Sequence, residues 1–199
     1  MHDECLTPEA AELALALSAT AARHELALGG GTACALRLGH RVSHDLDFFA
    51  LGQLDPTALL ADLAGFDDER LRGISHAELV VVLNGVQVSV TSLGRDVLAP
   101  TESWNALTVL SAPDLAELKV EAAVRRGMVR DLSDLHLLCL EGADLEAAIR
   151  ASGIDLVVAL KALTAAERFR GQPELELRRQ WSAEEAIAYF TAEARRLLG

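Results

Sequence analysis

Apolar residues in the first half of the chain recur at helical spacing in some segments and alternate with polar residues in others. Such a mixture is typical of a sheet flanked by helices. Thr7 and Pro8 match an N-cap followed by a first-turn proline, so the first helix is expected to begin there. The predicted helices of this half span residues 8–24, 32–38 and 56–64. The predicted strands span residues 26–28, 43–50, 70–74, 77–83 and 86–91.

The last two strands form the clearest pair in the sequence. Two valine-rich runs flank Asn84-Gly85. An Asn-Gly dipeptide between alternating apolar residues is typical of a two-residue type I′ turn, because both turn residues adopt positive φ. A β-hairpin is therefore predicted over residues 77–91.

From Ser111 onward the pattern is helical only. Pro113-Asp114 favour a helix start, and Gly127 is placed to end that helix. Further helices are predicted over residues 132–140, 145–151, 156–169 and 183–198. The pattern predicts an α/β (α+β) fold, with a mixed sheet flanked by helices in residues 1–110 and a helical half in residues 111–199. The two halves are expected to share one core.

Composition narrows the classes of protein that fit. Of the 199 residues, 51% are hydrophobic and 24% are charged, which is typical of a globular chain and excludes wholesale disorder. No uncharged apolar run reaches the about 18 residues of a membrane span, and the N-terminus lacks the pattern of a secretory signal. The three cysteines are scattered without a CxxC pair, which argues against a zinc site or disulfides and favours a cytoplasmic location.

Charge restricts the function further. The 18 Lys and Arg residues against 30 Asp and Glu residues give a formal net charge of -12. Broad nucleic-acid binding needs clustered cations to meet the phosphates, so no DNA partner is expected. Phosphate chemistry would have to rely on a local basic patch.

Candidate chemistry begins at the turn from strand 26–28 into helix 32–38, which reads Gly29-Gly30-Gly31-Thr32. Glycines let the backbone approach a ligand closely, and N–H groups at a helix start are suited to phosphate. A tight turn without a ligand is the alternative explanation. The segment is neither a Walker A motif nor a GxGxxG dinucleotide motif.

Asp45 and Asp47 lie two residues apart in a predicted strand, so their side chains share one face, while Leu46 and Phe48 take the other. Adjacent carboxylates repel unless a cation lies between them, and oxygen ligands suit Mg²⁺. A solvated strand face is the alternative for an isolated Asp-x-Asp pair. The Gly-Gly-Thr turn, a short helix and this pair in succession are more specific than either motif alone.

This succession resembles the DNA polymerase beta-type nucleotidyltransferase superfamily, and more closely its AbiEii/AbiGii abortive-infection toxin branch. The matching segments are Leu28-Gly-Gly-Gly-Thr-Ala-Cys-Ala-Leu36 and His40-Arg-Val-Ser-His-Asp-Leu-Asp-Phe-Phe49. A third signature lies in the helical half, where Lys119 precedes Arg130-Asp131-Leu132-Ser133-Asp134-Leu135. The resemblance covers residues 25–140.

The resemblance implies a nucleotidyltransferase-like mixed sheet whose nucleotide site is completed by the helical half. Asp45 and Asp47 would be the catalytic residues and would hold Mg²⁺ or Mn²⁺, with an NTP as substrate. The implied nucleotide-binding residues are Gly30, Gly31, Thr32, Arg41, Lys119, Arg126, Arg130, Asp131 and Asp134.

Residue spacing gives the helical signature a physical basis of its own. Lys119 and Arg126 are seven residues apart, which is two turns along one helix face. With Arg125 and Arg130 they would form the local basic patch. A charge cluster that complements the helix dipole is the alternative.

One position departs from the superfamily pattern. Active members carry a third carboxylate on a later strand beside the Asp-x-Asp pair, and Ser89 stands at the matching place. Alternation points Ser89 the right way, but a neutral hydroxyl is a poor Mg²⁺ ligand and no general base near neutral pH. Either another carboxylate such as Glu78 or Asp96 takes over, or a single-metal site remains, or nucleotide is bound without turnover.

The resemblance implies transfer of a nucleoside monophosphate from an NTP to a hydroxyl acceptor in RNA (transfer RNA foremost) or protein. It further implies a toxin of a toxin–antitoxin or abortive-infection system, with a cognate antitoxin as partner. The alternative is a degenerate nucleotide-binding or protein-interaction module that lacks turnover because of Ser89. The net charge argues against a large RNA, for which only the arginines at 125–130 and 168–179 are candidates.

Overall fold

In the computed structural model of this chain, residues 1–66, 70–172 and 175–199 are described. The chain divides into two compact units, Met1–Ser111 and Ala112–Gly199, and each is described by itself. The helices of the first unit are η1 (Asp3–Cys5), α1 (Pro8–Ala16), α2 (Ser18–Arg23), α3 (Gly30–Leu38) and α4 (Pro56–Asp62). Its strands are β1 (Leu26–Leu28), β2 (Leu46–Ala50), β3 (Arg70–Ser75), β4 (Glu78–Leu83), β5 (Val86–Ser92), β6 (Glu102–Trp104) and β7 (Leu107–Val109).

The seven strands form one mixed sheet in the order β3-β4-β5-β2-β1-β7-β6. β2 pairs with β5 in parallel and with β1 in antiparallel orientation, and β1 pairs with β7 in parallel. The predicted mixed sheet flanked by helices is therefore confirmed. β2 lies in the interior of the sheet, but it begins at Leu46, three residues after the expected start at residue 43. It therefore carries Asp47, and Asp45 directly precedes it.

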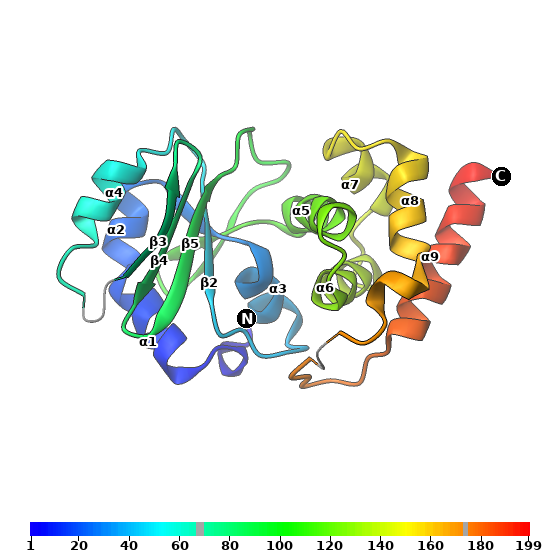
Figure 1. Ribbon diagram of the computed structural model, residues 1–199, viewed down its shortest axis with the longest axis horizontal. Helices are drawn as coiled ribbons and strands as arrows, with labels where there is room; N and C mark the ends of the chain where they lie inside the picture. The colour runs from blue at the N-terminus through cyan, green and yellow to red at the C-terminus, as the bar shows by residue number, and fades with distance from the viewer. Residues whose placement is uncertain (67–69, 173–174) are drawn as a thin grey trace. The chain divides into compact units, whose positions relative to one another are not determined.

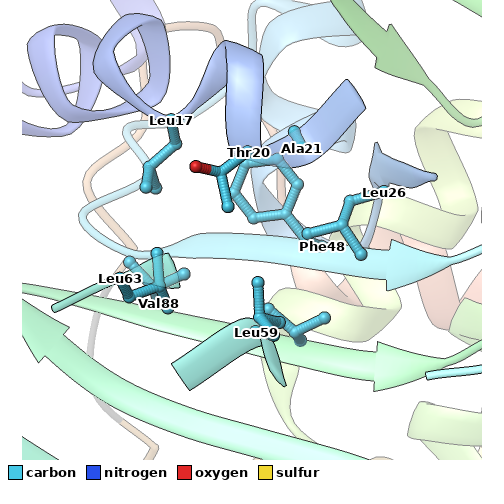
Figure 2. A pocket seen from close by; sticks show the side chains of 9 residues that line it. Leu17, Thr20, Ala21, Leu26, Phe48, Leu59, Leu63 and Val88 are labelled. Carbon is cyan, nitrogen blue, oxygen red and sulfur yellow. The ribbon is translucent and has the colours of Figure 1, made fainter. Parts of the chain in front are cut away.

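The two faces of β2 differ sharply. Leu46, Phe48 and Ala50 are buried on one face, which α1, α2 and α4 cover (Figure 1). Figure 2 shows the Phe48 ring directed toward Thr20 and Ala21 of α2. α3 contacts β2 from the other side of the sheet (Figure 1). The polar face of β2 therefore meets the start of α3.

The predicted hairpin is confirmed in detail. Leu83 pairs with Val86 across Asn84-Gly85, and the φ angles of these turn residues are 49° and 81°. Positive φ at both positions is the requirement of a type I′ turn. Beyond the hairpin, β3 pairs antiparallel to β4 with a shift of register between Leu71 and Gly73.

The expected first helix differs from the structure. Instead of one helix over residues 8–24, α1 ends at Ala16 and α2 begins at Ser18, with Leu17 buried between them. The sequence analysis also missed β6 and β7, which have three residues each and therefore too few positions for an alternating pattern.

The second unit is helical, as predicted. Its elements are α5 (Ala112–Arg125), α6 (Val129–Leu140), α7 (Leu145–Ala151), α8 (Leu156–Thr164), η2 (Ala166–Phe169) and α9 (Ala183–Leu198). α5 contacts α6, α7 and α8, and α9 packs against α6 and α8. The segment expected as one helix over residues 156–169 is α8 followed by the 3-10 helix η2, and α6 begins three residues before the expected start. Among the described residues, no helix combines the length and apolar character needed to cross a membrane.

Candidate active site

The carboxylate of Asp47 lies at the start of α3. Its Oδ2 accepts a hydrogen bond of 2.7 Å from the backbone N–H of Gly31, in the first turn of that helix. Its Oδ1 accepts a hydrogen bond of 2.8 Å from the hydroxyl of Ser89 on β5. A carboxylate is favoured at a helix N-terminus, where N–H groups lack intrahelical partners. Asp47 is thus fixed by one donor from α3 and one from the neighbouring strand.

Thr32 joins the same helix start to the entry of β2. Its hydroxyl donates to the backbone carbonyl of Asp45 and accepts from the backbone N–H of Asp47, both at 2.9 Å. The Thr32 side chain is fully buried. The structure therefore gives this hydroxyl a positioning role, because it sets the backbone from which both carboxylates project. Its role as a direct phosphate ligand stays a prediction.

Glycine is required where α3 approaches Asp47. Gly30 has φ +50°, and a Cβ there would lie 2.5 Å from Asp47 Oδ2. A Cβ on Gly29 would lie 2.3 Å from the Phe49 ring. A Cβ on Gly31 would lie 2.8 Å from a guanidinium nitrogen of Arg41. The three glycines therefore allow close approach of the backbone to side chains of the chain itself, and their approach to a ligand stays a prediction.

Arg41 lies in the connection between α3 and β2 and is buried. Its guanidinium donates to the backbone carbonyls of Val42 and Gly31, at 3.2 and 3.3 Å. The structure therefore brings Arg41 beside the glycine turn. Its predicted contact with a nucleotide stays a prediction.

Asp45 immediately precedes β2 and is partly exposed, in the same alternation as Asp47. It lines an open groove together with Arg70 and Arg72 of β3 and residues of the β4–β5 hairpin. Leu46 between the two aspartates is fully buried, which agrees with the predicted sharing of one face, but Asp45 lies just outside the strand and the sharing itself stays a prediction. The groove is therefore lined by Asp45, and Asp47 follows two residues later on β2.

The donor set fits a divalent cation such as Mg²⁺. Asp45 and Asp47 supply hard oxygen ligands, and each carboxylate oxygen of Asp47 has a second lone-pair direction besides the hydrogen bond it accepts. Among the described residues, no group of three or more His, Cys, Asp or Glu side chains is placed to hold a metal ion. A cation here would keep positions for water and substrate phosphate, as Mg²⁺ commonly does.

Ser89 stands at the expected place of the third carboxylate. Asp47 and Ser89 are register partners in the parallel pairing of β2 with β5, and Val80 of β4 pairs with Ser89 from the other side. The sequence expectation that Ser89 faces the acidic pair is confirmed by its hydrogen bond to Asp47. Glu78, one alternative carboxylate, pairs with Thr91 further along the hairpin.

In the helical unit, the third signature forms a cluster of buried charges. Lys119 Nζ of α5 lies 3.2 Å from Asp131 Oδ1 and 2.7 Å from Asp134 Oδ2 of α6. All three side chains are almost completely buried. Arg126 donates twice to the Asp131 carboxylate, at 2.7 and 2.8 Å. The expectation of a local basic patch is corrected here, because two aspartates neutralise Lys119 and one of them also engages Arg126.

The electrostatics of Asp131 follow from this cluster. Burial raises the pKa of the Asp131 carboxyl, but the hydrogen bond from Arg126 and the charges of Lys119 and Arg126 outweigh it. The pKa therefore lies below its ordinary value, and Asp131 is ionised at neutral pH. Arg130, the remaining residue of the signature, is exposed at the start of α6.

The sequence analysis did not identify Arg70 and Arg72 as neighbours of Asp45. They lie 25 and 27 positions further along the chain, in a strand that was predicted mainly from its two apolar residues, Leu71 and Ile74. Only the strand order β2-β5-β4-β3 with the hairpin register brings them to the same groove. Two arginines in one predicted strand were the sequence feature that could have indicated a phosphate-binding surface.

Comparisons with known proteins agree with this geometry. Residues 13–90 match the family model described as nucleotidyl transferase AbiEii toxin, type IV TA system. An uncharacterized protein of Aquifex aeolicus is 27% identical over 181 residues, which are 86% of this chain and 87% of that protein. The segment matched by the family model contains the glycine turn, both aspartates and Ser89.

Solved structures share the fold at low sequence identity. JHP933 from Helicobacter pylori has a TM-score of 0.58 at 15% identity, covering 96% of this chain and 92% of that chain. ANT(2″)-Ia in complex with adenylyl-2″-tobramycin has a TM-score of 0.54 at 13% identity, covering 74% of this chain and 98% of that chain. The resemblance inferred from the motifs is thus confirmed: the chain has a nucleotidyltransferase-like fold, and its residues 13–90 match the model of the nucleotidyl transferase AbiEii toxin family.

Proposed function

We propose that the protein transfers a nucleoside monophosphate from an NTP to a hydroxyl acceptor, with Mg²⁺ or Mn²⁺ held by Asp45 and Asp47. The observation that carries this proposal is the placement of Asp47, between the Gly31 N–H at the start of α3 and the Ser89 hydroxyl, with Asp45 two residues before it. Phosphoryl transfer needs little covalent help from a protein and depends on positioning and charge stabilisation. A site of this construction supplies both.

In the proposed reaction the oxygen of the acceptor hydroxyl bonds to the α-phosphorus of the NTP, the hydroxyl proton passes to water, and the bond from that phosphorus to the departing pyrophosphate breaks. A bound divalent cation would neutralise charge that develops on the phosphate oxygens. Asp45 and Asp47 would orient that cation, and Thr32 would hold the backbone of both. The glycine turn at Gly30 and Gly31 would admit the nucleotide phosphates to the start of α3.

Binding measurements test the first half of this proposal. Isothermal titration calorimetry with each NTP and Mg²⁺ is expected to show binding that Asp45→Asn and Asp47→Asn each weaken strongly. Glu12→Gln, which removes one exposed carboxylate from α1, is the matched control and should bind as the unaltered protein does. The proposal would be contradicted if no NTP bound, or if the Asp47→Asn variant bound NTP as tightly as the unaltered protein does.

A degenerate module that binds nucleotide without turnover is the second candidate. It is favoured by the hydrogen bond through which Ser89 engages Asp47, at the position where a third carboxylate would be expected. Ser89→Asp separates the two candidates when transfer from a labelled NTP to cellular RNA and protein is followed. Transfer by the unaltered protein supports the enzyme, whereas transfer by the Ser89→Asp variant alone supports the degenerate module.

The nature of the acceptor and the biological context complete the proposal. The acceptor is RNA, with transfer RNA as the leading candidate, or protein, and the reaction would make the chain the toxin of a type IV toxin–antitoxin system. A cognate antitoxin would then be encoded next to it. Co-expression with the neighbouring gene is expected to relieve growth inhibition, and unaltered inhibition would contradict this part of the proposal.

The predicted role of Lys119, Arg126, Arg130, Asp131 and Asp134 in nucleotide binding stays a prediction. Its sharpest test is Arg130→Gln, because Arg130 is exposed and its loss should leave the helical unit folded. NTP affinity reduced about tenfold, as expected for a lost charge-assisted contact, would support a phosphate contact by Arg130. An unchanged affinity would remove Arg130 from the binding set.

A further inference from the structure

The groove beside Asp45 extends across the sheet to its edge. Its lining includes Asp45, His44 and Gln87, and on the edge strand Arg70 and Arg72. All of these residues belong to the first unit. The groove therefore joins one of the two candidate metal ligands to a pair of arginines at the sheet edge.

The register explains why Arg70 lies on this face. Arg70 pairs with Val82, which pairs with Gln87, two residues before Ser89 on β5. Side chains directly opposite one another across a sheet lie on the same face, so Arg70 shares the face of Gln87 and Ser89. The face opposite is apolar there, because Val81 and Val88 are buried.

The second arginine lies at a β-bulge. Leu71 pairs with Val81 and Gly73 pairs with Val80, so Arg72 is the extra residue of β3. A bulge interrupts the alternation of side chains and redirects the extra residue. Arg70 and Arg72 are two residues apart, as alternation requires for side chains on one face, and both line the groove at the bulge.

The groove holds two arginines at its β3 end and two carboxylates, Glu9 and Asp45, at the other, and arginines are scarce in this unit. Residues 1–111 contain six arginines and no lysine against fifteen acidic residues. The six are Arg23, Arg37, Arg41, Arg70, Arg72 and Arg95. Arg23 and Arg37 form ion pairs with Asp62 and Glu102, whereas Arg72 is exposed and makes no hydrogen bond or ion pair in the described part of the chain. Two of only six cations thus line the groove that reaches Asp45.

The chemistry of the groove favours a chain of phosphates. Guanidinium groups bind phosphate through paired N–H donors, and two residues along a strand span about 7 Å, so the pair suits successive anionic groups. Among the described residues that line the groove, none is a Phe, Tyr or Trp on which a base could stack. β3 is separated from β2 by three strand spacings, about 14 Å, so Arg70 and Asp47 would contact different groups of a ligand.

We propose that Arg70 and Arg72 bind the phosphodiester backbone of a single-stranded nucleic-acid acceptor, whose terminal hydroxyl reaches the Asp45–Asp47 site. This inference rests on the proposed function, which supplies the nucleotide that the hydroxyl attacks. Because phosphates are contacted and bases are not stacked, binding is sequence-tolerant and falls steeply with salt.

The test measures binding of a fluorescent single-stranded RNA oligonucleotide to the full chain by anisotropy, with Mg²⁺ and without NTP, over a series of KCl concentrations. Arg70→Gln/Arg72→Gln is expected to weaken binding about tenfold or more and to reduce the slope of log K against log salt by about 1.4, for two lost contacts to a single strand. Arg70→Lys/Arg72→Lys retains both charges and should retain the slope.

Charge-matched and nucleotide controls make the outcome specific. Arg195→Gln/Arg196→Gln removes the same charge from exposed residues of α9 and should leave RNA binding unchanged. NTP binding by calorimetry should be equal in the glutamine variant of the groove and the unaltered protein. Loss of NTP binding in that variant would assign the arginines to the nucleotide instead and overturn the proposal.

Two further results would also overturn it. One is RNA binding that is insensitive to the groove variant. The other is transfer from a labelled NTP to protein and not to RNA, at a rate that is the same in the unaltered protein and in the Arg70→Gln/Arg72→Gln variant. Failure of the proposed function looks different, because the unaltered protein would then bind no NTP while its RNA binding still depended on Arg70 and Arg72.

Discussion

The backbone at Gly30 is held in a conformation that only glycine adopts readily, and the reason is its closeness to Asp47. The φ angle of +50° and the 2.5 Å between a hypothetical Cβ and Asp47 Oδ2 are independent constraints. A side chain here would force the carboxylate away from the Gly31 N–H that holds it. At the residue scale, the glycine turn and Asp47 therefore act as one unit.

Gly30→Ala is expected to destabilise the first unit by about 2 kcal/mol, because left-handed backbone costs an L-residue roughly 1–2 kcal/mol before the clash is counted. NTP affinity should fall with it, since Asp47 must move. Thermal unfolding and calorimetry measure the two effects.

Gly73→Ala on β3 is the matched control, because a Cβ there meets nothing within 4 Å and no left-handed φ is involved. It should lower neither stability nor NTP affinity. Equal behaviour of the two alanine variants would contradict the proposed coupling of Gly30 to Asp47.

Residue motifs identified the glycine turn and the acidic pair because both depend on short-range sequence. The contact of Ser89 with Asp47 was reached through the family resemblance, since the sequence alone does not place β5 beside β2. Arg70 and Arg72 were not found, because their approach to Asp45 depends on strand order and on cross-strand register. Non-local pairing is thus what local patterns could not supply.

At the scale of elements, the contact of α5 with α6 contains a buried ion cluster. Lys119 of α5 lies between Asp131 and Asp134 of α6, and Arg126 forms a second ion pair with Asp131. Removing one member of a buried pair leaves an uncompensated charge, which costs more than the pair contributes. The cluster therefore fixes the register of the two helices only while all its charges are present.

Lys119→Met should destabilise the helical unit by about 3 kcal/mol, because two buried carboxylates lose their shared cation. Arg125→Met is its control, since Arg125 is exposed and its ion pair with Glu121 is worth at most about 0.5 kcal/mol. Urea unfolding followed by circular dichroism measures both. A Lys119→Met variant as stable as the Arg125→Met variant would show that the cluster contributes nothing.

The contact of α6 with the segment before α9 is expected to depend on pH. The Trp181 indole N–H donates to His136 Nδ1 at 3.1 Å, which requires that nitrogen to be unprotonated. Burial lowers the pKa of His136 below its ordinary 6.5, although the charge of Glu185 opposes this effect. As pH falls, His136 is therefore protonated in the unfolded chain before it is protonated in the folded one. The free energy of unfolding accordingly decreases as the pH is lowered below about 6.5.

Thermal unfolding between about pH 7.5 and about pH 5.5 should accordingly show a larger loss of stability in the unaltered protein than in a His136→Gln variant, which cannot titrate. Trp181 fluorescence reports the same step locally. An identical pH dependence in both proteins would rule out His136 as its source.

Elements were predicted well wherever their pattern was long enough. The β4–β5 hairpin and the helices after Ser111 follow from alternation, turn chemistry and helix caps. The break between α1 and α2 could not be predicted, because Leu17 continues the apolar pattern of the helix across it. The three-residue strands β6 and β7 are recognised only by their pairing with β1 and with each other.

At the scale of the whole molecule, the net charge of -12 sets how much nucleic acid the chain can hold. Four of the seven arginines expected to serve a large RNA are engaged within the helical unit, among them Arg125 with Glu121. Arg126 is bound to Asp131, Arg179 lies 3.3 Å from Glu141, and Arg168 donates to the backbone carbonyl of Val124. The pair at Arg70 and Arg72 therefore carries most of the proposed contact with an acceptor.

RNA affinity should consequently stop rising once the oligonucleotide spans the groove. With two phosphate contacts, the slope of log K against log salt is expected near -1.4 and to be the same for longer strands, because each added phosphate meets a predominantly acidic surface. Anisotropy titrations with single-stranded RNAs of increasing length measure this directly. A slope that steepens with length would reveal a further basic surface, and the arginines of the helical unit would then be the residues to substitute next. A constant slope would mean that the chain recognises the end of its acceptor and excludes the rest by charge.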